Sequence, residues 1–162
     1  MLKLLAKIFG DKSQKDIKGM MPLVEATKRE GETLLSISND ELRAKTSEIQ
    51  NVINEKLKPI DDQIASIRQR LAEHGELDIT EKETLFAEID KLELERNKEL
   101  EKVLIEVLPK TFAVVRETAR RFKENEYLEV TASEQDIIFA AKYPNVKIVG
   151  DKAHWNRQWL AA

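Results

Sequence analysis

The chain has 162 residues, of which 35% are charged and 41% hydrophobic, and its formal net charge at pH 7 is −3. This balance suits long, solvated helices around one domain-sized core better than a thick, many-layered fold. Because cysteine is absent, the composition excludes disulfides and thiolate metal sites. No apolar run is long enough to predict a membrane span. The sequence also has no long basic face with interleaved aromatics, so nucleic-acid binding is not predicted.

The N-terminal residues are predicted to form a short amphipathic helix. Within residues 1–9 the apolar side chains cover one arc, Lys3 and Lys7 point the other way, and Gly10 is expected to end the helix. Such a helix can pack on its own domain, dock in a partner's groove, or lie in a membrane interface with anionic lipid. The sequence leaves these three open. The candidate membrane- or partner-binding residues are Leu2, Lys3, Leu5, Lys7, Ile8 and Phe9.

Two further helices are predicted next. The first covers about residues 13–30, with Pro22 as a kink or restart and Gly31 as its end. Ser38 and Glu41 then have the spacing of a capping box, in which each residue satisfies the backbone N–H of the other. A long helix is therefore expected to begin at this point.

This long helix and the next one are predicted to form an antiparallel hairpin. From Ile53 to Leu71 the apolar positions recur in alternating steps of four and three residues, which is coiled-coil spacing, and Pro59 predicts a bend within this seam. A turn at 74–78 and a second capping box at 80–83 start the return helix. Its seam matches the first, and Arg96 within it is expected to pair with Asp61 or Asp62.

The last third of the sequence changes from helical to strand periodicity. Pro109 is predicted to end the hairpin, and a short helix at 111–123 is expected to support a small sheet. Gly150 and Asp151 predict a type II′ turn between two strands. The remaining predicted elements are strands at 127–131, 145–149 and 152–159 and a helix at 137–142 capped by Ser133.

Together the elements predict a mainly α (α+β) fold, with a long antiparallel helical hairpin plus short helices and a small antiparallel β-sheet near the C-terminus. The expected segments are residues 1–37, with the amphipathic helix and the second helix, residues 38–108, with the hairpin, and residues 109–162, with the short helix and the sheet.

The residues that usually carry chemistry form no recognisable site. No Gly-rich loop is followed by Lys-Ser or Lys-Thr, so no phosphate cradle is predicted. His74 and His154 are the only histidines and lie in different predicted elements. No nucleophile is paired with a histidine base. We therefore predict no catalytic, cofactor-binding or metal-binding residue within these 162 residues.

Three blocks carry a family resemblance: Met1 to Gly10, Ser38 to Thr46, and Leu108 to Arg121. In this order they resemble the SecA family of bacterial preprotein translocase ATPases, whose members carry Leu-Ser-Asp-Glu-Glu-Leu-Lys/Arg-x-Lys-Thr and Leu-Leu-Pro-Glu-Ala-Phe-Ala-Val-Val-Arg-Glu-Ala. The stretch Phe112 to Glu117 is the most specific match.

The sequence also departs from that pattern. The predicted hairpin separates the second and third blocks, which typical members place close together. A strand-rich segment, 125–162, stands where the family continues to an Asp-Val-Gln-Leu stretch and a Gly-Glu-Gly-Lys-Thr phosphate loop. The chain therefore resembles an N-terminal portion from a variant with two insertions, and no ATP-contacting residue can be transferred to it.

The resemblance implies a portion that is non-catalytic by itself and provides membrane or channel docking and scaffold contacts, with ATP and magnesium used by the parent protein. It implies three partners, namely the translocation channel, an anionic membrane surface and unfolded preprotein, with a homodimer as a further candidate and no nucleic acid. In the family, the segment matching Leu2 to Phe9 contributes to contact with acidic lipid, the channel and the second protomer. The implied location is cytoplasmic, with peripheral association at the inner face of the plasma membrane. The alternative is a free-standing helical-hairpin interaction module, such as a chaperone or adaptor.

Overall fold

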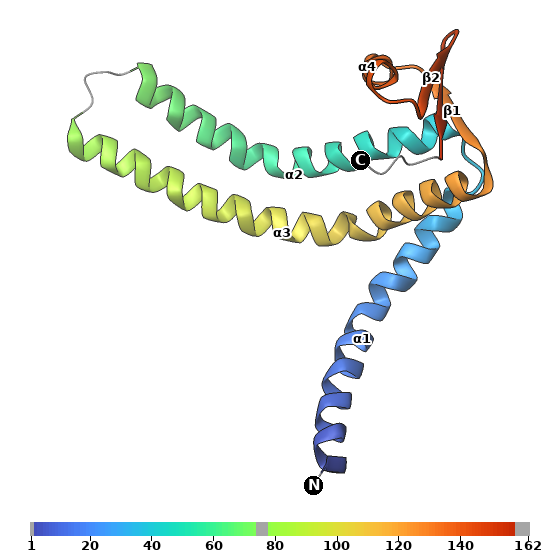
Figure 1. Cartoon of the computed structure of the whole chain (residues 1–162). Helices are drawn as coiled ribbons and strands as arrows, with labels where there is room; N and C mark the ends of the chain where they lie inside the picture. The colour runs from blue at the N-terminus through green and yellow to red at the C-terminus, as the bar shows by residue number, and fades with distance from the viewer. Residues whose placement is uncertain (1, 74–77, 158–162) are drawn as a thin grey trace. The chain divides into compact units, whose positions relative to one another are not determined.

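The computed structural model describes the backbone of residues 2–73 and 78–157, and the side chains of residues 14–73 and 78–157. Three long helices precede a small sheet near the C-terminal end, which confirms the predicted mainly α fold (Figure 1). The elements are α1 (Leu2–Thr33), α2 (Asn39–Glu73), α3 (Ile79–Glu124), β1 (Tyr127–Thr131), α4 (Glu134–Lys142), β2 (Val146–Val149) and β3 (Lys152–Asn156). Among the described residues, no helix has both the length and the apolar character needed to cross a membrane.

The chain divides into two compact units. The first unit comprises residues 1–46 and 108–162, and it contains α1, the start of α2, the end of α3 and the sheet. The second unit comprises residues 47–107 and is an antiparallel hairpin made from the rest of α2 and α3. The three-segment division expected from the sequence stays a prediction.

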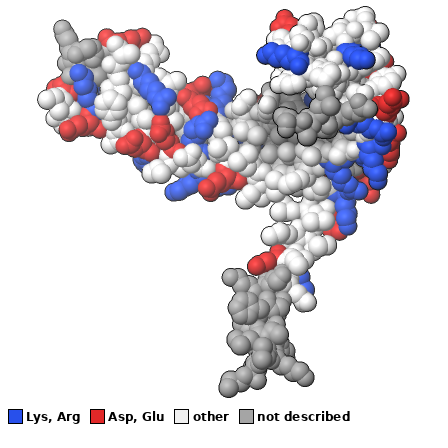
Figure 2. All heavy atoms as spheres, in the orientation of Figure 1, with Lys and Arg blue, Asp and Glu red and all other residues white. Residues whose placement is uncertain are grey.

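The hairpin unit is held by the predicted apolar seam. Arg96 donates from Nε to Asp61 Oδ1 at 2.5 Å, so the charge in the seam is paired with one of the two expected acids. Both signs of charge are interspersed along the outside of the hairpin, as a solvated helix surface requires (Figure 2). The buried cluster consists of Ile60, Ile64, Ile89 and Leu92, with Ile67 and Leu71 packed against it.

The first helix is longer than predicted. α1 runs without a break through Gly10 and Pro22, so the expected separation into two helices was wrong. A glycine in a helix interior costs only about 1 kcal/mol relative to alanine, which does not end a helix between good helix formers. The helix ends at Thr33, two residues after the predicted stop at Gly31.

The third helix is also continuous, so the predicted boundary at Pro109 was wrong. The helix expected at 111–123 is the C-terminal part of α3, and Pro59 likewise lies inside α2. A proline in a helix interior costs about 3 kcal/mol because it removes one backbone hydrogen bond and crowds the preceding turn. Val107 and Ala113, on either side of Pro109, are both buried. The stabilisation from burying these side chains outweighs the cost of the proline in the helix.

The helix starts follow local capping chemistry. At the start of α2, Ser38 N–H donates to Glu41 Oε2 at 2.7 Å and Glu41 N–H donates to Ser38 Oγ at 3.2 Å, which confirms the predicted capping box. The box predicted at 80–83 was wrong. Glu81 N–H instead donates to Asp78 Oδ1 at 2.8 Å, because aspartate caps a helix as well as threonine and Glu81 completes the same spacing.

The sheet has the strand order β1-β3-β2, and both pairings are antiparallel. A two-residue turn joins β2 to β3, and Gly150 within it has φ 62°. Asp151 has no positive φ, which fits the predicted type II′ turn. Ser133 caps α4 as predicted, and α4 packs beside β2.

Candidate functional site

The two sequence blocks at 38–46 and 108–121 meet around the buried guanidinium of Arg121. Its Nε donates to Glu117 Oε1 at 2.8 Å and its Nη1 donates to Asn39 Oδ1 at 2.8 Å. Its Nη2 donates to the main-chain oxygens of Leu34 and Ile37, at 2.9 and 2.8 Å. One side chain thus ties the segment between α1 and α2 to the last turns of α3.

Glu117 supplies the charge that this arginine needs. Its side chain is only 4% exposed and also accepts from Arg120 Nη2 at 2.7 Å. Hydrogen bonds from Arg120 favour the ionised carboxylate, whereas burial disfavours it. A hydrogen bond from Arg121 also favours the ionised form, so the pKa of Glu117 falls from 4.5 to about 2. The pair is therefore ionised at neutral pH and its charges are compensated within the protein.

A second charged centre joins α2 to α4 and the sheet. Arg43 binds Asp136 in a bidentate manner, with Nη1 to Oδ2 at 2.8 Å and Nη2 to Oδ1 at 2.9 Å. Trp155 Nε1 and Ser133 Oγ also donate to this carboxylate, at 3.0 and 2.8 Å. Burial opposes ionisation of Asp136, but these donors outweigh it, and its pKa falls from 3.8 to about 2.

The first turns of α2 also satisfy the outer edge of β1. Asn39 Nδ2 donates to the main-chain oxygen of Glu129 at 3.0 Å, and Arg43 Nη1 donates to that of Thr131 at 3.2 Å. Thr131 N–H donates in turn to Asp40 Oδ1 at 2.8 Å. An unpaired strand edge is a site for unwanted strand pairing, so these side chains occupy positions that another strand would use. Asn39, Asp40 and Arg43 of the 38–46 block therefore have structural partners.

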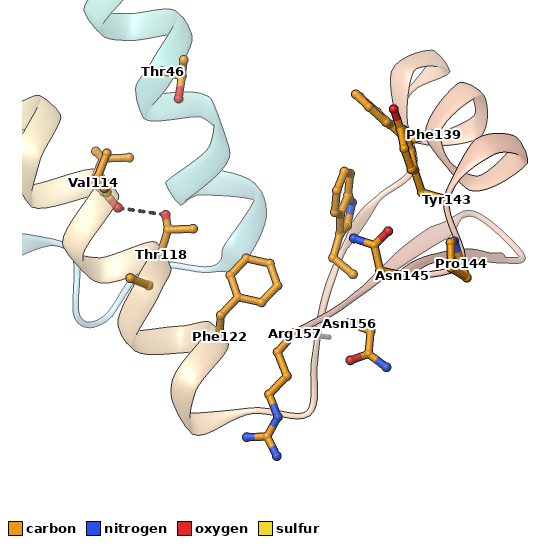
Figure 3. Close-up of a pocket in the computed structure, with 13 residues that line it drawn as sticks. Thr46, Val114, Thr118, Phe122, Phe139, Tyr143, Pro144, Asn145, Asn156 and Arg157 are labelled. Atoms are coloured by element: carbon orange, nitrogen blue, oxygen red, sulfur yellow. Dashed lines mark hydrogen bonds between the residues drawn. The ribbon is translucent and has the colours of Figure 1, made fainter. Parts of the chain in front are cut away.

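An apolar groove of about 960 Å³ lies beside this network in the first unit (Figure 3). Its walls come from the last turns of α3, from α4 with the segment after it, and from β3. Phe122 points into the groove from α3, across from Tyr143 and Asn145 (Figure 3). The ring of Phe139 lies 5.6 Å from that of Tyr143 and 5.8 Å from that of Trp155, measured between centroids.

The structure separates the aromatic residues near the sheet. Tyr143 and Trp155 share the groove, whereas Tyr127 stacks on His154 with a centroid distance of 4.7 Å and is not among the groove-lining residues. Trp159 lies outside the described residues. His154 also lies 3.2 Å from a carboxylate oxygen of Glu129.

The docking role of the candidate residues at the N-terminus stays a prediction. Leu2 to Phe9 belong to α1, but their side chains lie outside the described residues. Within the part of the chain whose side chains are described, no group of three or more His, Cys, Asp or Glu is arranged to hold a metal ion.

The charged network was missed by sequence reasoning. Glu117 and Arg121 have helical i, i+4 spacing, which was visible but is common on solvated helices. Arg43 and Asp136 are 93 residues apart, and no local pattern connects them. The capping role of Ser133 was the only local signal near Asp136.

Comparison with known proteins identifies the family. The model of the SecA DEAD-like domain matches residues 5–135. The chain is 51% identical over its whole length to protein translocase subunit SecA of Cytophaga hutchinsonii. It is 42% identical over 98% of its length to the SecA of Amoebophilus asiaticus, and 40% identical over 98% to that of Flavobacterium psychrophilum.

These matches extend through the residues of the hairpin and of the strand-rich segment, so the sequence of both segments is similar to that of these relatives. The chain spans 14% of the length of each of the three. No solved structure shows significant similarity to the chain. The family match over most of the sequence, together with these relatives, establishes that the chain belongs to the SecA family.

Proposed function

We propose that this chain is the non-catalytic N-terminal part of a SecA-type protein-translocating ATPase, in which it provides a frame and docking contacts. Family membership carries the proposal, because relatives named protein translocase subunit SecA align with the whole chain. The chain spans 14% of those relatives. In this proposal, ATP and magnesium bind to parts of the full-length protein outside these 162 residues.

The two charged centres support a framing role. Arg121 donates several hydrogen bonds and Asp136 accepts several, and both side chains are buried. Their partners include residues from distant parts of the chain. Breaking such a buried pair leaves an uncompensated buried charge, and this is strongly destabilising. The free-energy cost therefore opposes local deformation of the region. A motor that moves a polypeptide needs parts that stay fixed while others move, and this region has the contacts of such a fixed part.

The opening helix supports a docking role. The sequence predicts that Lys3 and Lys7 fall opposite an apolar arc, which is the pattern of a helix in a membrane interface. Each basic residue near an anionic surface contributes about 1 kcal/mol to attraction. The partners in this proposal are the translocation channel, an anionic membrane surface and the unfolded preprotein. The location is cytoplasmic, with peripheral association at the membrane.

Flotation with lipid vesicles tests the docking part of the proposal. The chain is mixed with vesicles of anionic lipid and with vesicles of neutral lipid, at low and high salt. We expect the unchanged chain to float with anionic vesicles at low salt. The double replacement Lys3→Glu with Lys7→Glu should lower the bound fraction at least about tenfold, because two attractions become repulsions.

The control is Lys142→Glu with Lys147→Glu, at two exposed positions on α4 and β2. Both double variants take the net charge from −3 to −7, because two Lys→Glu changes subtract four charges. The control should keep most of the vesicle binding. Equal loss in both variants would show that only overall charge matters, and equal binding by all three proteins would remove the lipid contact from the proposal.

A further inference from the structure

The exposed apolar residues of the hairpin unit belong to only one of its two helices. Among the described residues of this unit, α2 has no exposed large apolar side chain. On α3, by contrast, Leu94 is 64% exposed, Ile105 is 61% exposed and Phe86 is 56% exposed. These residues are separate from the buried seam through which the two helices pack. The exposed large apolar residues of α3 within this unit are Ile79, Phe86, Leu94, Leu104 and Ile105.

Four of these residues form a stripe along the helix, which we call the α3 stripe: Phe86, Leu94, Leu104 and Ile105. Because an α-helix turns by about 100° per residue, Phe86 and Leu104 point in nearly the same direction. Leu94 and Ile105 follow about 80° and 100° further round the helix. The buried seam lies about 60° to 120° from Phe86 in the opposite sense, so the stripe does not face α2. From Phe86 to Ile105 the stripe is about 28 Å long.

The charged residues within the arc of the α3 stripe are all acidic. Glu83, Asp90 and Glu101 fall inside this arc, and all three are exposed. No lysine or arginine of α3 between residues 79 and 107 falls inside it. The three carboxylates make no hydrogen bond or ion pair with another described residue. The hairpin unit as a whole, residues 47–107, has sixteen acidic and nine basic residues, a formal charge of −7.

An apolar stripe beside unpaired carboxylates complements a basic amphipathic helix. Connected apolar surface that stays exposed usually marks a binding site, and a helix with apolar residues at three- and four-residue spacing fits a stripe of this shape. Basic side chains beside that apolar face would meet the carboxylates. Such pairs select the partner by its charge and speed its association. An anionic membrane or a nucleic acid is disfavoured here, because both would be repelled by the same carboxylates.

We propose that the α3 stripe is a docking site for a basic amphipathic helix of another protein. The apolar face of that helix covers Phe86, Leu94 and Ile105, and its lysines or arginines pair with Glu83, Asp90 or Glu101. The proposal goes beyond the proposed function, because it concerns the hairpin unit and not the opening helix.

Binding of a defined peptide tests the proposal. The probe is a fluorescein-labelled peptide of about 18 leucine and lysine residues, with all leucines on one helical face, which spans about 27 Å as a helix. The control peptide has the same composition with the leucines spread over all faces. Fluorescence anisotropy at low salt measures binding of both peptides to the 162-residue chain and to the full-length protein. We expect the probe to bind at least about tenfold more tightly than the control peptide.

Two matched pairs of replacements separate the stripe from overall charge. Glu83→Gln with Glu101→Gln removes two carboxylates of the stripe, and Glu88→Gln with Glu95→Gln removes two exposed carboxylates from the far side of α3. Each pair takes the formal net charge from −3 to −1. We expect the first pair to weaken probe binding at least about fivefold, as for the loss of two surface ion pairs. The second pair should change it less than about twofold.

The apolar part of the stripe is tested by Leu94→Ser with Ile105→Ser. Both side chains are exposed, so the buried seam should stay intact, which circular dichroism checks. We expect this double variant to bind the probe at least about tenfold more weakly, because two apolar contacts are lost.

Four results would overturn the proposal. Equal binding of the probe and the control peptide would show attraction by charge alone. Equal loss in the two glutamate pairs would show that only net charge matters. A full-length protein whose probe affinity is unchanged by the stripe replacements would show that the rest of the polypeptide covers the stripe. Self-association of the chain in analytical ultracentrifugation that Leu94→Ser with Ile105→Ser abolishes would assign the stripe to a second copy. None of these results bears on vesicle binding through the opening helix, so the two proposals fail independently.

Discussion

At the scale of single residues, buried charges are held by complete sets of partners. Asp136 is 2% exposed and accepts hydrogen bonds from Arg43, Ser133 and Trp155, which belong to three separate parts of the first unit. A buried carboxylate without such donors would be protonated or would destabilise the fold. Asp136 therefore holds these three parts together through hydrogen bonds, and its negative charge is necessary for that role.

Replacing this carboxylate should weaken the fold in a way that depends on pH. Folding lowers the pKa of Asp136 from 3.8, and that of Glu117 from 4.5, to about 2. The folded state therefore binds fewer protons than the unfolded state. The stabilisation is complete above about pH 4.5 and is lost as the pH falls through about 2. We expect Asp136→Asn to lower the free energy of unfolding at pH 7 by about 2 kcal/mol.

The measurement is urea unfolding at several pH values between 2 and 7, followed by tryptophan fluorescence. Asp136→Asn should lose less stability over the acid range than the unchanged chain, because one of the carboxyls whose pKa is lowered by folding is gone. Asp151→Asn makes the same chemical change at an exposed turn position and should preserve the original pH dependence. If the two variants have the same stability at pH 7, the role given to Asp136 is wrong.

At the scale of secondary-structure elements, the hairpin depends on a narrow seam. Ile64 is 5% exposed and packs with Ile60, Ile89 and Leu92. An aspartate at position 64 would place a carboxylate in this cluster without a partner and would also remove apolar volume. We expect Ile64→Asp to destabilise the hairpin unit by about 4 kcal/mol and to lower its helical circular dichroism.

Leu94→Asp is the matched control, because Leu94 lies in the same unit on α3 but is 64% exposed. It carries the same helix-propensity penalty and should cost less than about 1 kcal/mol. Thermal melts followed by circular dichroism compare the two variants. Similar melts for both would contradict a buried seam.

The sequence predicted element types better than element ends. Apolar periodicity identified the hairpin, and turn chemistry identified the strands and the turn at Gly150, because both signals are local. Local residue preferences predict helix ends at Gly10 and Pro109, yet α1 and α3 continue through them. At Pro109 the deciding factor is burial on both sides of the residue, and this depends on tertiary contacts that no local pattern contains.

At the scale of the whole molecule, the family blocks and the structural network coincide. The block at 38–46 supplies Asn39, Asp40 and Arg43, while the block at 108–121 supplies Glu117 and Arg121. The sequence showed that these blocks belong together through their order and resemblance. It did not show their contacts, because the partners are separated by 80 residues or more, such as the 82 between Asn39 and Arg121.

We propose that these 162 residues act as frame and contact surface within a longer translocation ATPase. The most direct test of this role is magnesium-dependent ATP hydrolysis, measured side by side for the purified chain and for the full-length protein at equal molar concentration. We expect turnover by the full-length protein and no turnover above the buffer rate by the chain. Hydrolysis by the chain that rises in proportion to its concentration would contradict the account.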